Sequence, residues 1–270
     1  MTRSDARCIL TGMKPLNESA TKVAALYDVH GNLPALEAVL RDVAASGIAY
    51  VVFGGDLVLG PMPRETLRVA RTPSGAWRTA FIRGNCDRLV VAAADGLLPS
   101  NLPPGVADAI VWCAGQLPPD DVAFLRALPE SVTIDVDALG EGGGPVRFVH
   151  ATARTDEEIF TIRTPDERIA EMFAGVVEQT VVCGHTHMQF ERKVGDLMIL
   201  NAGSVGMPYG EPGAHWCELA AAPVMHNTSY DLQDAAARVR RTEYPGAEEF
   251  AVRSILAPPG RELMLNALIR

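Results

Sequence analysis

Short apolar runs alternate with polar blocks along much of the chain. The runs at 23–27, 50–53 and 79–82 have the length of buried strands. Apolar residues at helical spacing follow the first two runs, at 34–43 and 63–71. Because strands alternate with helices, the pattern predicts an α/β fold whose sheet is largely parallel and covered on both faces.

The rest of the pattern predicts the domain organisation. Residues 89–128 are mostly helical in pattern, and we expect a small helical cap insertion there, beside the strand ends. Residues 1–22 are mixed and polar, which predicts a flexible leader, and residues 23–270 are expected to form a single domain. Other elements are expected as strands at 132–136, 147–149, 180–183 and 215–219, a hairpin at 190–200, and helices at 166–173 and after 231.

Polar side chains directly follow five of the predicted strands. The blocks are DVHGN at 28–32, GGD ending at Asp56, GNCD at 84–87, His150, and GHTH at 184–187. In open α/β sheets, ligands bind at the carboxyl ends of the strands. We therefore expect the five blocks to converge on one site.

Taken singly, most of these blocks have a plain structural explanation. Asp28 suits a helix N-cap, His30 a surface loop, and Asp56 a turn, while GNCD is compatible with an Asx turn. GHTH is a stronger signal, because two imidazoles follow the apolar run VVC. Four of the six histidines of the chain fall in these blocks, and this coincidence favours a site over separate structural roles.

The donor types indicate a pair of divalent metal ions. Carboxylate, amide oxygen and imidazole together suit Mn, Fe or Zn better than Ca or Mg. Two ions about 3.5 to 4 Å apart share a bridging carboxylate, hold a water as hydroxide, and neutralise phosphate oxygens during in-line displacement. The pattern thus points to phosphate ester chemistry.

Charge and composition exclude several other classes. The formal net charge of −9 and the lack of a basic cluster beyond 238–241 argue against a nucleic-acid polymer or an anionic membrane surface as partner. No apolar span reaches transmembrane length. Five widely spaced cysteines without a CxxC pair are typical of a reducing cytoplasm. A small phosphate ester or nucleotide is the expected partner, and a homo-oligomer stays compatible with the sequence.

In this order, the five blocks resemble the calcineurin-like metallophosphoesterase superfamily, and its small phosphodiesterase-like branch in particular. The resemblance runs from Val23 to about Gly206. It implies a four-layer αββα sandwich in which two β-sheets pack face to face with helices outside. It also implies the following roles: Asp28, His30 and His187 hold one metal, Asn85, His150 and His185 hold the other, Asp56 bridges the two, Asp87 supports the site without ligating metal, and Asn32 and Cys86 line the substrate side.

One residue departs from the pattern of the family. Many members have His where this chain has Cys86, and that His assists the leaving group. A thiol is a poorer proton donor, so substrates with good leaving groups, or a water-mediated proton path, are favoured. Cys86 serves equally well as a small apolar filler. Arg83, Arg154, Tyr209 and His215 stay open as substrate contacts.

The leading hypothesis is a metal-dependent phosphoesterase that cleaves a phosphomonoester or phosphodiester by direct attack of metal-bound hydroxide, with Asp56, Asn85 and Asp87 as its catalytic residues. A serine nucleophile is not favoured, because no GxSxG block follows a strand. A dinucleoside polyphosphate or other nucleotide hydrolase is one alternative. The other is an interaction scaffold that has lost hydrolysis, for which Cys86 is the only support.

Overall fold

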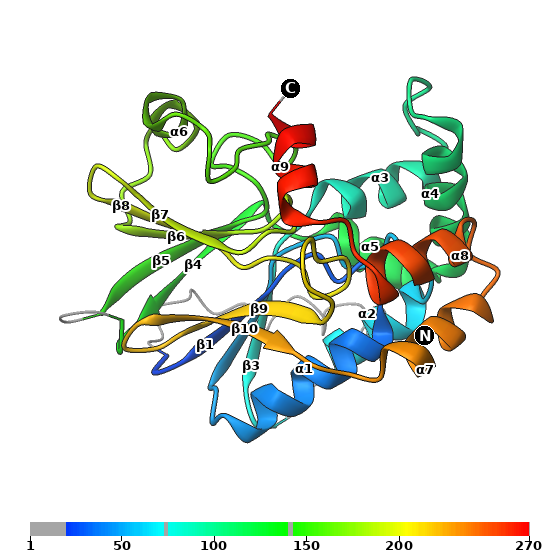
Figure 1. Cartoon of the computed structure of the whole chain (residues 1–270), viewed down its shortest axis with the longest axis horizontal. Coiled ribbons are helices and arrows are strands. Elements are labelled where there is room, and N and C mark those ends of the chain that lie inside the picture. Colours follow the sequence, from blue (N-terminus) through cyan, green and yellow to red (C-terminus); the bar gives the residue numbers. More distant parts are fainter. Residues whose placement is uncertain (1–19, 73–74, 140–142, 270) are drawn as a thin grey trace, which may run out of the picture.

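Two five-stranded sheets face each other with helices outside them in the computed structural model of the chain (Figure 1). The structure describes residues 20–72, 75–139 and 143–269, so most of the predicted leader lies outside the described residues. Ala20, at the end of that leader, forms a β-bridge with Val136. The predicted sandwich of two sheets between helices is confirmed.

Both sheets are mixed rather than largely parallel. The first has the order β10-β9-β1-β2-β3, with β1 at Val23–Leu26, β2 at Tyr50–Phe53, β3 at Arg78–Phe81, β9 at Ala214–Leu219 and β10 at Pro223–Thr228. The second has the order β4-β5-β6-β8-β7, with β4 at Ser131–Val136, β5 at Gly144–Val149, β6 at Thr180–Cys183, β7 at Phe190–Val194 and β8 at Leu197–Asn201.

Only the strands joined through longer crossovers run parallel. β1, β2 and β3 pair in parallel, as do β5, β6 and β8, whereas β9 pairs antiparallel with both β1 and β10. Short connections such as β7–β8 and β9–β10 force antiparallel pairing. The prediction of a largely parallel sheet was wrong because it did not take these short connections into account. The edge strand β10 was not predicted.

Alternate residues of the central strands supply two different cores. In β1, Val23 and Ala25 belong to the core between the sheets, whereas Ala24 and Leu26 face the helices on the outside. Because both faces are buried, these strands read as continuous apolar runs. A third apolar cluster covers the outer face of the second sheet beneath α6.

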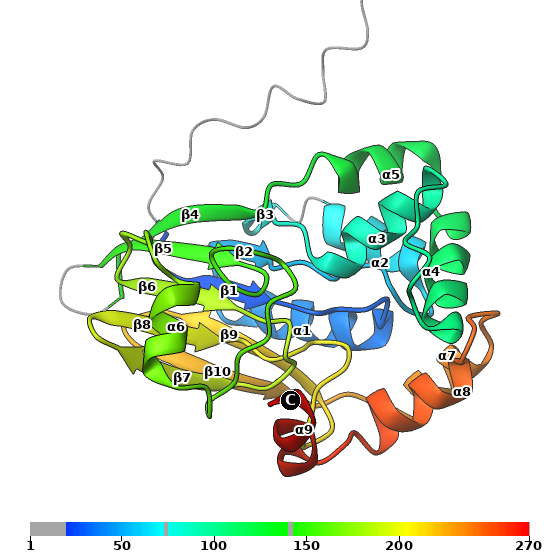
Figure 2. The same cartoon turned by 90° about the horizontal axis from the view of Figure 1, so that it is seen from above.

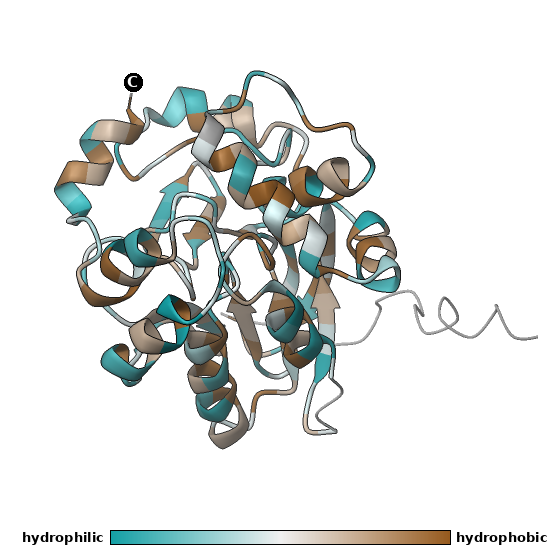
Figure 3. Cartoon of the chain, turned by 90° about the vertical axis from the view of Figure 1, so that its right-hand side faces the viewer, coloured by the Kyte–Doolittle hydropathy of each residue, from teal (hydrophilic) through white to brown (hydrophobic). Residues whose placement is uncertain are grey.

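The helices lie outside the two sheets (Figure 2). They are α1 at Leu33–Ala45, α2 at Pro63–Arg71, α3 at Asn85–Ala94, α4 at Pro104–Gln116, α5 at Pro119–Arg126, α6 at Asp166–Met172, α7 at Leu232–Arg240, α8 at Ala247–Phe250, the π-helix η1 at Ala251–Leu256, and α9 at Arg261–Leu268. Hydrophilic and hydrophobic residues alternate along the helices at the end seen in Figure 3, as expected where one face is buried. Among the described helices, none is long and apolar enough to cross a membrane.

A buried tyrosine at the end of β1 explains two of the glycines in the polar blocks. The Tyr27 hydroxyl donates a hydrogen bond to the Val182 carbonyl of the opposite sheet, 2.9 Å away. A Cβ atom at Gly54 would lie 2.0 Å from the Tyr27 ring, and one at Gly184 would lie 2.6 Å from it. Glycine therefore lets the loops after β2 and β6 approach β1 closely.

The strand ends carry strained backbone. Among the described non-glycine residues, positive φ angles occur at five positions, namely Asp28 (53°), His30 (47°), Asp56 (54°), His185 (65°) and His187 (57°). All five belong to the predicted metal-binding set. Asp and His tolerate this left-handed conformation better than most residues, yet each such residue still costs about 1–3 kcal/mol.

Replacing His185 tests this strain without touching the core. We expect His185→Gly to be more stable than His185→Ala by about 1 kcal/mol, because glycine adopts a positive φ without the Cβ clash that alanine suffers. The free energy of unfolding by denaturant, measured with a chelator present, gives the difference. At Asp108, inside α4, the same pair of substitutions should show the reverse order by about 1 kcal/mol. Equal stability of the two His185 variants would contradict the account.

Candidate metal centre

The carboxyl ends of five strands meet and bring the seven predicted metal ligands together. Asp28 and His30 follow β1, Asp56 follows β2, and Asn85 opens α3 just after β3. His150 follows β5, and the two histidines of GHTH follow β6. Although these positions are up to 159 residues apart along the chain, from Asp28 to His187, their side-chain donors lie within a few ångströms of one another.

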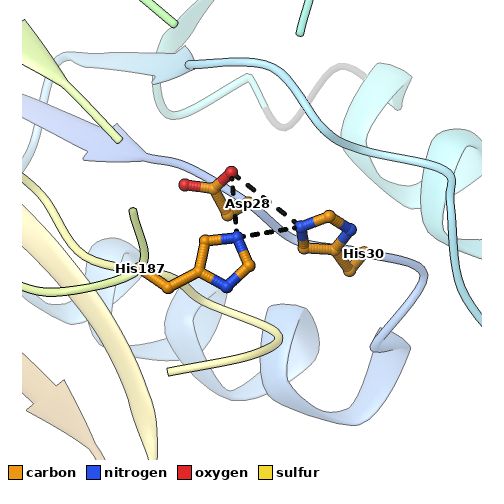
Figure 4. Close-up of side chains that lie close together, drawn as sticks. All are labelled: Asp28, His30 and His187. Atoms are coloured by element: carbon orange, nitrogen blue, oxygen red, sulfur yellow. Dashed lines mark hydrogen bonds and ion pairs between the residues drawn. The ribbon is translucent and has the colours of Figure 1, made fainter. Parts of the chain in front are cut away.

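Asp28, His30 and His187 form the first group of donors (Figure 4). The Nε2 atoms of His30 and His187 lie 3.2 Å apart. Oδ1 of Asp28 lies 3.4 Å from Nε2 of His187 and 3.9 Å from Nε2 of His30. All three residues are buried. Three donors thus surround a single point next to β1.

Asn85, His150 and His185 form the second group. Oδ1 of Asn85 lies 3.1 Å from Nε2 of His150. The rings of His150 and His185 meet edge to face, with centroids 5.2 Å apart. One donor atom each from His150, His185 and Asp56 lies within 4.8 Å of the others.

Asp56 lies between the two groups. Its Oδ2 atom is 3.7 Å from Nε2 of His30 and 3.5 Å from Nε2 of His150. Its other oxygen, Oδ1, accepts a hydrogen bond from the Cys86 backbone N–H at 2.9 Å. One oxygen is therefore held by the backbone, while the other faces both groups of histidines.

Backbone carbonyls orient all four imidazoles. The Nδ1 atoms of His30, His150 and His187 lie 3.1, 2.9 and 2.8 Å from the carbonyl oxygens of Leu59, Gly54 and Met207. Since a carbonyl only accepts, these bonds assign the proton to Nδ1 and leave Nε2 as a donor for a cation. His185 is reversed, with Nε2 3.1 Å from the Glu157 carbonyl, so its Nδ1 is the free donor.

The donors fit cations better than they fit one another. The facing lone pairs on Nε2 of His30 and His187 repel unless a proton or a metal ion lies between them. Oδ1 of Asp28 is fully buried and has no hydrogen-bond partner, although Oδ2 accepts from the His185 N–H at 2.8 Å. An uncompensated buried carboxylate oxygen is costly, and a divalent ion among these atoms would remove that cost.

The close packing of carboxylates and imidazoles shifts the pKa values of the histidines. Burial, the largest influence on His150, lowers its pKa, but the carboxylates of Asp56 and Asp28 outweigh burial and raise the pKa to about 10. Burial and the neighbouring His187 lower the pKa of His30. A proton on His150 thus compensates the Asp56 carboxylate in the metal-free protein, and metal binding would displace that proton.

Asp87 holds the loop that carries Asp56. Its two carboxylate oxygens accept hydrogen bonds from the backbone N–H groups of Asp56, Leu57, Val58 and Gly84, at 2.8 to 3.3 Å. The side chain is fully buried. Both oxygens are thus occupied by backbone N–H groups, which is compatible with a supporting role and leaves neither oxygen free for a metal.

The two predicted substrate-side residues fall in different places. Cys86 lines the cavity beside the donors, and its sulfur lies within 4.8 Å of donor atoms of His30 and Asp56. The structure does not bring Asn32 into that cavity. Its Oδ1 caps α1 by accepting from the Ala35 N–H, and its Nδ2 donates to the Gly206 carbonyl at 2.9 Å. Its polar atoms are occupied by structural bonds.

Sequence reasoning missed the residues that fasten the loops from the second sheet. The Asn201 side chain donates to the Gly184 carbonyl at 2.7 Å and to the Thr186 hydroxyl at 3.0 Å. Ser204 donates to the Asp28 carbonyl at 2.7 Å. Tyr209, which the sequence left open as a substrate contact, stacks on the His187 ring, with centroids 5.3 Å apart. The NAGS segment after β8 was the available signal, because its polar residues directly follow a buried strand.

The fold and the sequence have clear relatives. A metallophosphoesterase from Sphaerobacter thermophilus is 26% identical, with a TM-score of 0.64 over 87% of this chain and 98% of its own. A hypothetical protein from Pyrococcus horikoshii shares the fold at 19% identity, with a TM-score of 0.74 over 90% of this chain and 100% of its own. An uncharacterised protein of Methanocaldococcus jannaschii is 26% identical over 239 residues, which span 82% of this chain and 87% of that protein.

The sequence profile of the calcineurin-like phosphoesterase superfamily domain matches residues 22–220. This match includes all five polar blocks and both sheets except β10. It covers well over half of the sequence, and the chain therefore belongs to the calcineurin-like phosphoesterase superfamily.

Proposed function

We propose that this chain is a dinuclear metal-dependent phosphoesterase that hydrolyses a small phosphomonoester or phosphodiester by direct attack of water at phosphorus. The observation that carries the proposal is the position of Asp56 Oδ2, between Nε2 of His30 at 3.7 Å and Nε2 of His150 at 3.5 Å. When bound, two divalent ions would supply Lewis acidity, activate water near neutral pH, and neutralise phosphoryl oxygens.

The protein's own residues would hold the two ions in fixed positions. Asp28, His30 and His187 would bind one ion, and Asn85, His150 and His185 the other, with Asp56 shared between them. The mixture of nitrogen and oxygen donors favours Mn, Fe or Zn. Because backbone carbonyls and N–H groups fix the donors before any ligand arrives, little reorganisation is needed on binding.

The adjoining cavity supports a small substrate with an apolar group. Its volume is about 330 Å³, at the low end for small-molecule sites. Donors of the metal centre form its floor, and the apolar residues around it are Leu59, Ile159, Met207, Tyr209, Tyr244 and Leu268. A single aryl or nucleoside group suits these walls better than the two nucleosides of a dinucleoside polyphosphate.

The apolar rim comes partly from outside the matched domain. Tyr244 and Leu268 lie beyond residue 220, where the family match ends. None of the described residues of the helical insertion at 89–128 lines the cavity. We infer that the C-terminal segment, rather than the insertion, shapes the substrate side of the site.

A complete donor set argues against the scaffold alternative. All seven predicted ligand positions hold competent donors, and five of them keep a strained backbone. A protein that served only as a scaffold would have no need to retain this strain.

The four described cysteines are free thiols, which supports the predicted reducing, cytoplasmic location.

Asp56→Asn tests the bridge. The amide keeps the size of the side chain but loses the charge shared by the two groups, so turnover of an aryl phosphate should fall at least about 100-fold. The melting temperature in chelator should change little. Asp196→Asn, in the exposed β7–β8 turn, is the matched control and should keep full activity. Near-normal turnover of Asp56→Asn with metal bound would refute the bridging role.

Cys86→His tests the role of the residue that departs from the family pattern. Burial, and after it the Asp56 carboxylate, raises the pKa of the Cys86 thiol, so the thiol is a weak proton donor. We expect the imidazole to raise kcat for an alkyl phosphate by about tenfold and to change kcat for a nitrophenyl phosphate much less. Cys86→Ala should resemble the native protein on both substrates. Equal effects on the two substrates would exclude a role in leaving-group protonation.

A double substitution at the rim tests the substrate side. Ile159→Ser with Leu268→Ser should raise KM for phenyl phosphate about three- to tenfold and leave kcat unchanged, since only apolar contact is lost. KM for methyl phosphate, which has no ring to bury, should not move. Val177→Ser, at a side chain 88% exposed, serves as control. A fall in kcat alone would show that the rim acts on the metal centre instead.

A further inference from the structure

A second cavity, lined by arginines, adjoins the metal centre on the side of His150. Its volume is about 260 Å³, and its lining includes Arg83, Arg88, Arg147 and Arg154, together with His150 and Asp156. The cavity described above shares none of these residues. The arginine-lined cavity therefore reaches the second group of donors from another direction.

The cavity lies beside the edge strands β3 and β4 and the interior strand β5. Arg147 lies on β5, two residues before Val149, which faces the outer apolar cluster of the second sheet. Arg83 and Arg88 flank Asn85, so they come from the same segment as a predicted metal ligand. The Arg83 backbone N–H donates to the Pro129 carbonyl just before β4, which joins the two edges.

Two of the four arginines are already satisfied. Arg88 donates two hydrogen bonds of 2.9 Å to Asp156 and one of 2.6 Å to Glu157. Arg154 is paired with Glu158. These two residues build the wall of the cavity, and the Asp156 charge is compensated by Arg88.

Arg83 and Arg147 are not satisfied in this way. The Nε atoms of both are buried and have no hydrogen-bond partner. Arg83 pairs through Nη2 with Glu130 at 2.8 Å, but that glutamate is 81% exposed, so the pair contributes little. Arg147 has only a 3.5 Å contact with the Ser131 hydroxyl and a 3.9 Å contact with Glu178.

We propose that this cavity is an anion subsite in which Arg83 and Arg147 bind a phosphoryl or similar tetrahedral oxyanion. Guanidinium groups present planar forks of N–H donors that match such oxygens. Both side chains line the cavity and stay partly exposed, 23% for Arg83 and 29% for Arg147, and the Nη groups of Arg147 make only the two long contacts described above. The two carboxylates of the lining do not oppose binding, because Arg88 neutralises Asp156 and Glu130 extends into solvent.

Calorimetric titration of inorganic phosphate into the full chain, with chelator and at low salt, tests the proposal. One phosphate should bind per chain, and Arg83→Gln and Arg147→Gln should each weaken binding about 10- to 100-fold. Arg126→Gln, at an exposed arginine paired with Asp95, should leave binding unchanged. Arg147→Lys, which keeps the charge without the fork, should give an intermediate affinity, and melting curves verify that each variant is folded.

The absence of phosphate binding, or equal affinity in the native protein and in both folded glutamine variants, would overturn the proposal. Since the titration requires neither metal nor turnover, phosphate binding can be found or excluded independently of whether the protein is a phosphoesterase.

Two activity measurements, which rest on the proposed function, identify the source of the anion. If it is a second phosphoryl group of the substrate, metal-loaded protein should prefer phenylene bisphosphate to phenyl phosphate by about tenfold in kcat/KM, and Arg83→Gln should lose that preference. If it is free phosphate, added phosphate should change kcat for phenyl phosphate in the native protein and not in Arg83→Gln.

Discussion

Two buried carboxylates, Asp28 and Asp56, whose charge must be compensated inside the protein are the constraint on which the rest of this structure depends. Asp28 and Asp56 each use one oxygen on a backbone N–H and turn the other toward histidine nitrogens that backbone carbonyls have already oriented. Inside a protein such charges must be paired, by protons or by cations. The metal-free protein meets this need with protons on imidazole, and divalent ions would meet it with more charge and better geometry.

The sandwich provides the rigidity that this arrangement requires. Five of the donors have left-handed backbone conformations, which persist only where the surroundings over-determine them. Those surroundings are two apolar cores, the Tyr27 bond across the sheets, and the loop bonds made by Asp87, Asn201 and Ser204. The packing and hydrogen bonds of the sandwich thus hold a strained, charged cluster of side chains in place.

Much of this was predictable from the sequence, because buried strands give continuous apolar runs and the polar blocks follow them directly. Most strands, most helices and the convergence of the metal donors were predicted in this way, whereas the arrangement of the strands in two packed sheets was implied by the family resemblance. β10 was not predicted, because its sequence PVMHNT has neither a continuous apolar run nor a strict alternation of apolar and polar residues. The rim residues Ile159 and Leu268 were not predicted either, because their place beside the site depends on tertiary packing. Asn32 was placed on the substrate side from its position in a block, whereas its side chain caps α1. Arg83 and Arg147 come to line one cavity only through tertiary contacts, which no local pattern encodes.

The central claim is that the seven donors enclose two neighbouring cations. Anomalous diffraction from crystals grown with Mn or Zn tests it most directly. The account predicts two peaks about 3.5 to 4 Å apart, with Asp56 between them and three further donors around each peak. A single peak at the site would contradict it. So would metal peaks that lie elsewhere on the protein while no peak appears among these seven side chains.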